Sequence, residues 1–119
     1  MKYRLADFGR IFSTRDRGAE MRRDALDRLS GAPVDSLTID LDDVLSVSYS
    51  FVDEYIGELA QMSGGRTPSF ANVSPLAART ISRSLSNRGL EVPPEVAAQV
   101  PGRARAGRGR QASARTEPA

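Results

Sequence analysis

The chain has 119 residues, of which 39% are hydrophobic and 27% are charged, a balance typical of one soluble domain around a single core. It contains no cysteine and no histidine, which excludes disulfides, thiolate zinc sites, cysteine nucleophiles and Ser-His-Asp arrangements. No apolar run approaches the ~20 residues needed to span a bilayer, and the N-terminal residues lack the pattern of a signal peptide. We therefore expect a cytoplasmic protein that does not engage a membrane.

Charge is distributed unevenly along the chain. Five arginines and one glutamate follow position 100, which gives +4 there and leaves −2 on residues 1–100. Residues 101–119 contain no Val, Ile, Leu or aromatic side chain, so they cannot bury enough apolar surface to offset the entropy of ordering. The sequence thus predicts one domain over 1–100 and a disordered Arg/Gly/Ala-rich tail over 101–119. The arginines of this tail are Arg103, Arg105, Arg108, Arg110 and Arg115.

The first part of the chain is expected to form a strand, a helix and a second strand. The strands span residues 2–6 and 36–41, where apolar side chains alternate. The helix spans about 14–29, with Ser13 or Thr14 as N-cap. Inward-facing residues are predicted to be Tyr3 and Leu5, then Met21, Ala25 and Leu29 with Leu26 beside them, then Leu37, Ile39 and Leu41. On the helix, Arg22, Arg23, Asp24 and Asp27 are predicted to face water.

The second part is expected to repeat this alternation. A helix over about 50–62 follows Ser48-Tyr49-Ser50, a short strand covers 69–73, and a helix over about 75–88 starts at Ser74-Pro75. A short last helix is expected to begin at the prolines 93–94 and to end by Val100. The helix over 50–62 is predicted to bury Phe51, Val52, Tyr55, Ile56, Leu59 and Met62 and to expose Asp53, Glu54 and Glu58. The helix over 75–88 is predicted to bury Ala77, Ile81 and Leu85.

The resulting order, β-α-β-α-β-α, predicts an α/β domain with a small, largely parallel or mixed sheet, because helical crossovers connect parallel neighbours. In such sheets binding sites lie at the carboxyl ends of the strands and the amino ends of the helices. Here that position is occupied by polar residues between 40 and 54. We call the following set the docking edge: Asp42, Asp43, Ser48, Tyr49, Ser50, Asp53 and Glu54.

The carboxylates of this region allow two interpretations. Carboxylates after a strand can hold magnesium, as in receiver-type phosphoacceptor sites, which would make Asp40 and Asp42 ligands in a metal-dependent enzyme. Such a site also needs a later lysine at the same edge, and the only lysine is Lys2. We therefore favour turn carboxylates on a solvated surface, with no metal and no cofactor.

The hydroxyls at 48–50 also allow two interpretations. A serine at a helix N-terminus commonly caps it, which contributes about 0.5–2 kcal/mol. The same position can accept a phosphate, because free N–H groups and the helix dipole stabilise the added charge. The residues alone favour the cap.

The order of motifs resembles the STAS domain (sulfate transporter and anti-sigma factor antagonist). The matching stretches are Ile39–Phe51, where a strand ending in aspartate leads to a hydroxyl-rich helix start, then Asn72-Val73-Ser74-Pro75 and Gly89-Leu90. The chain is closest to an uncharacterised STAS-like branch, through Phe8-Gly9, Ser13-Thr14-Arg15 and Ser50-Phe51-Val52-Asp53-Glu54. In the family's pattern an aspartate stands at Ser48 and a glycine at Phe51.

This resemblance implies a non-catalytic protein–protein interaction domain that works as a phosphorylation-controlled partner switch. It implies Ser50 as phosphoacceptor, and as partner an anti-sigma-type regulator or a histidine-kinase-like ATPase that acts as a serine kinase. An alternative function, less favoured, is nucleic-acid association through the basic residues 103–115, whose Arg-Gly spacing suits contacts with phosphates but lacks aromatic side chains for stacking.

Overall fold

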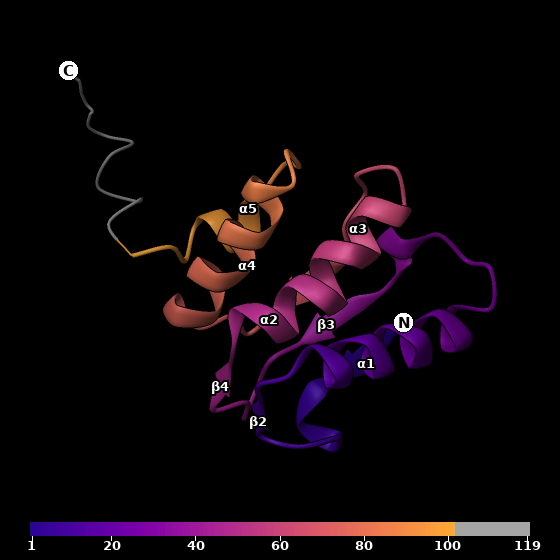
Figure 1. Cartoon of the computed structure of the whole chain (residues 1–119), viewed down its shortest axis with the longest axis horizontal. Coiled ribbons are helices and arrows are strands. Elements are labelled where there is room, and N and C mark those ends of the chain that lie inside the picture. Colours follow the sequence, from indigo (N-terminus) through magenta and orange to yellow (C-terminus); the bar gives the residue numbers. More distant parts are fainter. Residues whose placement is uncertain (102–119) are drawn as a thin grey trace.

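The computed structural model describes residues 1–101, which form a small parallel sheet covered on one face by helices (Figure 1). The strands β1 (Lys2–Arg4), β3 (Thr38–Asp40) and β5 (Ser69–Ala71) pair in parallel, with β3 in the centre and Ile39 opposite both Tyr3 and Phe70. This confirms the predicted α/β class and parallel strands, although each strand is shorter than the alternation suggested.

One face of this sheet is apolar and the other is polar. Tyr3, Leu37, Ile39 and Phe70 are buried, whereas Lys2 and Ser69 are exposed, as the period of two requires. The helices therefore all pack on the apolar face of the sheet. The buried core consists of Tyr3, Leu5, Phe12, Met21, Ala25, Leu29, Val34, Leu37, Ile39, Leu41, Phe51, Val52, Tyr55, Ile56, Leu59, Ala60, Phe70, Ala77, Ala78, Ile81, Leu85 and Val96.

A second, two-stranded sheet was not predicted. β2 (Ile11–Phe12) pairs in parallel with β4 (Ser46–Val47), with Phe12 opposite Val47. Two short 3₁₀ turns, η1 (Leu5–Asp7) and η2 (Val34–Ser36), precede β2 and β3. Pairing of strands 35 positions apart holds the segment before α1 against the segment before α2.

The bounds, the N-cap and the buried residues of the first helix agree with the prediction. α1 (Arg15–Leu29) has Thr14 as N-cap, whose hydroxyl accepts a hydrogen bond from the Arg17 N–H, and Ser30 closes it in the left-handed region. Met21, Ala25 and Leu29 are buried as expected.

The second helical segment is continuous from 49 to 62 but changes its winding. It consists of α2 (Tyr49–Val52), the π-helical turn η3 (Asp53–Gly57) and α3 (Glu58–Met62). The wider π turn keeps positions four residues apart on one face, and the buried pairs recur at that spacing, as Phe51/Val52, Tyr55/Ile56 and Leu59/Ala60. Ala60 is buried and Met62 is 56% exposed, which contradicts the prediction for Met62.

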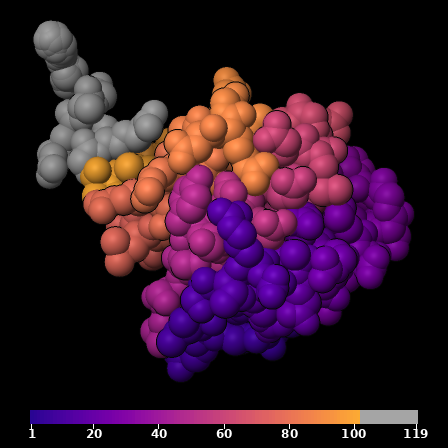
Figure 2. Space-filling view, viewed as in Figure 1, coloured from indigo at the N-terminus to yellow at the C-terminus, as the bar shows by residue number. Residues whose placement is uncertain are grey.

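The remaining helices complete the covering layer. α4 (Pro75–Asn87) begins with Ser74 as N-cap and proline at its first position, as predicted, and α5 (Pro94–Ala97) follows. The segment 49–62 lies between α1 and α4, and both contact η3 (Figure 1). In the space-filling view the purple residues and the orange α4 and α5 lie on opposite sides of the molecule, and indigo atoms reach across the magenta ones between them (Figure 2). No helix of residues 1–101 is long and apolar enough to cross a membrane.

Candidate functional site

The start of α2 is fixed by Ser48 rather than by Ser50. The Ser48 hydroxyl accepts a hydrogen bond from the Phe51 N–H at 3.1 Å and donates one to the Ser13 carbonyl at 2.9 Å. Ser50 is the second residue of the helix and is half-buried, so the helix starts one residue earlier than predicted. Its neighbour Phe51 is fully buried against Phe12, with ring centroids 4.9 Å apart, so its ring is part of the core.

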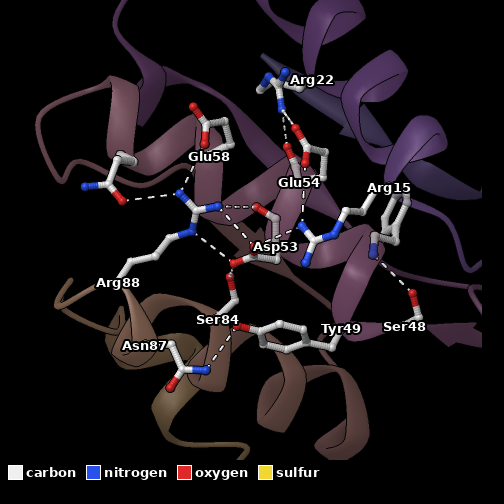
Figure 3. A network of polar contacts seen from close by, with 12 residues as sticks. Arg15, Arg22, Ser48, Tyr49, Asp53, Glu54, Glu58, Ser84, Asn87 and Arg88 are labelled. Carbon is white, nitrogen blue, oxygen red and sulfur yellow. Dashed lines mark hydrogen bonds and ion pairs between the residues drawn. The ribbon is translucent and has the colours of Figure 1, made fainter.

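Tyr49 extends the site toward α4. Its hydroxyl accepts a hydrogen bond from Asn87 Nδ2 at 3.0 Å (Figure 3). The guanidinium of Arg83 lies over its ring, 5.0 Å from the centroid, in a cation–π contact. Tyr49 thus links the start of α2 to the exposed face of α4.

Asp53 is the centre of a polar network between three helices (Figure 3). Arg88 donates from Nε to Oδ1 at 2.9 Å and from Nη2 to Oδ2 at 3.1 Å, a bidentate pair, while Ser84 Oγ donates to Oδ1 at 2.7 Å. Arg15 of α1 donates to Oδ2 at 3.1 Å. The Arg88 hydrogen bonds, with those of Ser84 and Arg15, outweigh desolvation and lower the pKa of Asp53 to about 2.

Glu54 is also held by arginine side chains, in this case from α1. Arg22 donates to its carboxylate at 2.9 Å and also to its backbone carbonyl, and Arg15 lies 3.5 Å from Oε1. The Arg22 hydrogen bond is the main reason that the pKa of Glu54 is lowered. The predictions that Asp53, Glu54 and Arg22 face water are therefore wrong, because each side chain is partly buried between helices, where it finds an opposite charge. Sequence spacing does not show these pairs, which join positions more than 30 residues apart.

The network requires a glycine where the helices meet. A Cβ built on Gly57 would lie 2.5 Å from Ser84 Oγ and 2.7 Å from Arg88 Nε. The π turn and this glycine together bring the backbone of η3 against α4. The signal in the sequence was a glycine inside an apolar helical pattern, which often marks such a close approach.

The acidic residues after β3 lie in a separate group. Asp40 is buried and accepts hydrogen bonds from Asn72 Nδ2 at 2.9 Å and from the Asp42 N–H at 3.0 Å; these contacts, the Asn72 one first, lower its pKa. Asp42 and Asp43 are exposed, and Asp43, with a positive φ of 66°, pairs with Arg4 at 2.7 Å. Within residues 1–101 no group of three or more acidic, histidine or cysteine side chains is placed to hold a metal.

The predicted docking edge is therefore divided. Asp42, Asp43 and Ser48 lie at the carboxyl end of the sheet, whereas Asp53 and Glu54 are neutralised by arginines of α1 and by Arg88, which follows α4. Ser50 lies between these parts, one helical turn before Asp53 and Glu54 and on the same side of the helix.

An apolar groove beside the docking edge was missed by the sequence analysis. It has a volume of about 560 Å³ and lies between the segment 41–47 and the first turns of α4. We call it the β4–α4 groove. Leu45 and Leu76, two of its lining residues, are 67% and 70% exposed. The sequence signal was weak, since an isolated leucine in a loop or on a helix is common on protein surfaces.

No protein-family model, no curated protein and no solved structure matches this chain. The resemblance to STAS domains consequently stays a prediction based on the motifs themselves. The expected disordered tail and the basic residues 103–115, which carried the nucleic-acid alternative, lie outside the described residues.

Proposed function

We propose that this protein is a non-catalytic, STAS-like docking domain that binds a partner protein at the carboxyl end of its sheet. The observation that carries the proposal is the clustering of exposed apolar side chains at that end. Leu45 and Leu76 line the β4–α4 groove, and Ile11, 66% exposed, lies on β2 directly opposite Ser46 of β4. An apolar groove with exposed apolar side chains at its rim and polar residues beside it is typical of protein interaction sites.

The ionisation of the acidic residues supports a non-catalytic role. A general acid or base needs a pKa near the working pH. The pKa values of Asp40, Asp53 and Glu54 are all shifted downward, away from neutrality. These carboxylates are bound as ions in hydrogen-bonded pairs, which suits a structural role.

Phosphorylation of Ser50 is the regulatory part of the proposal. Ser50 is half-buried, does not cap the helix, and lies one turn before Asp53 and Glu54. A phosphate there adds about −1.5 to −2 charges beside carboxylates whose arginines are already engaged, and it competes for Arg15, which is half-exposed. The expected effect is weaker partner binding. By resemblance, the partner is an anti-sigma-type regulator or a histidine-kinase-like ATPase.

Site-specific photo-crosslinking tests the docking face. A photoreactive phenylalanine analogue replaces Leu45 or Leu76 in cells, and Met62 serves as a matched control, because it is also exposed and apolar but lies at the far end of α3. We expect the same partner to be captured from both groove positions and not from Met62. Equal capture at all three positions, or capture at none, contradicts the docking face.

Calorimetric titration of the captured partner then tests the switch. Ser50→Asp should weaken binding by more than tenfold, whereas Ser50→Ala should bind as the unmodified protein does. Both variants should keep the circular dichroism spectrum, since Ser48 provides the cap. Equal affinities of the two variants refute the switch and leave the docking face intact.

A further inference from the structure

We infer that the β4–α4 groove receives a short peptide segment of the partner that carries an aliphatic side chain next to a carboxylate. The inference rests on the proposed docking function and specifies the chemistry of the docked segment. Three features of the groove carry it: its apolar walls, one cationic side chain, and a strand edge with unused backbone groups.

The walls of the groove are suited to an aliphatic anchor. Leu41, Val44 and Val47 form one side, and Leu76 and Ala77 of α4 form the other. The volume of about 560 Å³ is within the range of roughly 300–1,000 Å³ typical of ligand sites. Its outer lips, Leu45 and Leu76, project into solvent, which favours a macromolecular occupant over a small molecule enclosed by the pocket.

The positive charge of the groove favours a docked segment that carries an acidic residue beside its aliphatic anchor. Arg79 is the single charged side chain among its lining residues. None of the ion pairs between described residues involves Arg79. A carboxylate beside the aliphatic anchor would complement it, since interfaces place opposite charges together at their rims.

The edge of β4 supplies a backbone contact. Phe12 lies opposite Val47, and its carbonyl accepts from the Ser48 N–H at 2.9 Å, so β2 bonds to the residues that flank Val47. In a parallel pair this pattern directs the Val47 N–H and C=O away from β2. Among the described residues, no hydrogen bond outside the β2–β4 pair uses the Val47 N–H or C=O, and Val47 lines the groove, so both groups can bond the main chain of a docked segment.

Selection from a displayed library of random twelve-residue peptides on the immobilised full chain tests the inference. We expect enriched sequences to combine one or two aliphatic residues with Asp or Glu. Arg79→Glu should weaken their binding by about tenfold or more, and changing the peptide's acid to lysine should restore it. Arg23→Glu, the same charge reversal at an exposed position of α1, is the matched control and should have no effect.

The outcomes separate this inference from the proposed function. Enriched peptides without an acidic residue, binding that is indifferent to Arg79→Glu, or no enrichment at all overturn the peptide chemistry. If the crosslinking partner is nevertheless captured at Leu45 and Leu76, the docking face stands and only the assigned segment is wrong. If the partner is captured equally at Met62, the docking face itself fails.

Discussion

The Asp53–Arg88 pair predicts a loss of stability that depends on pH in a defined way. Asp53→Asn keeps the size of the side chain and removes its charge, which breaks the pairs with Arg88 and Arg15. The side chains of Asp53 and Arg88 are 13% and 19% exposed, so solvent screens the pair only partly. The pKa of Asp53 falls from its ordinary 3.8 to about 2, which corresponds to about 2 kcal/mol of stability at pH 7.

The sign of the pH dependence follows from the lowered pKa. The contribution is fully present well above pH 4, and it is lost as the pH falls toward 2, because the carboxylate is then protonated in the folded state as well. Urea titrations at pH 7, 5, 4 and 3 should therefore show the unmodified protein more stable than Asp53→Asn by about 2 kcal/mol at pH 7 and by roughly half of that at pH 3.

A matched control keeps this test specific. Asp27→Asn removes a carboxylate from the exposed side of α1, and its effect should remain within about 0.5 kcal/mol at every pH. A difference between Asp53→Asn and the unmodified protein that is the same at pH 3 and pH 7 would refute the electrostatic reasoning and assign the loss to packing.

Three further predictions concern stability and are checked by urea titration. Tyr55→Phe should leave stability unchanged or raise it by about 1 kcal/mol, because the buried Tyr55 hydroxyl has no hydrogen-bond partner among the described residues. Tyr3→Phe should instead cost about 1 kcal/mol, because it loses the 2.7 Å hydrogen bond to Asp24. A loss of stability from Tyr55→Phe as large as that from Tyr3→Phe contradicts this prediction. Phe51→Ala should cost about 3–5 kcal/mol, since the ring is fully buried, and an unchanged midpoint would show that it is not part of the core. Gly57→Ala should cost about 1–3 kcal/mol despite the better helix propensity of alanine, because its Cβ collides with α4, and a stabilised variant would mean that α4 shifts freely.

Much of the fold could be predicted because local signals agree with the tertiary structure. Thr14 and Ser74 cap α1 and α4 as their positions in the sequence indicate, and Phe51 is buried in the stripe that it begins. The alternation around Ile39 identified the central strand. In each case one short segment carries the whole signal, so no knowledge of distant residues is required.

The rest depends on contacts between distant segments. β2 and β4 have two residues each, too few for alternation to be detectable, and they are strands only because they pair with each other. Met62 lies outside the buried pairs that recur every four residues through the π turn, a spacing that an ordinary helical period does not predict. The carboxylates of Asp53 and Glu54 have the polarity of a solvated face, and only the packing of α1 and α4 shows that arginines enclose them.

The meeting of η3 and α4 also provides a fingerprint for finding relatives of this chain. Asp53 and Gly57 are four residues apart on one helix, and Ser84 and Arg88 are four residues apart on the other. A substitution at any one of these four positions leaves an unpaired charge, removes a hydrogen bond or creates a collision with one of the other three. We therefore expect the four residues to vary together or not at all among relatives. A sequence in which Asp-x-x-x-Gly and Ser-x-x-x-Arg occur about 30 positions apart, each inside a helical pattern, is expected to share this helix packing even where its overall identity is low.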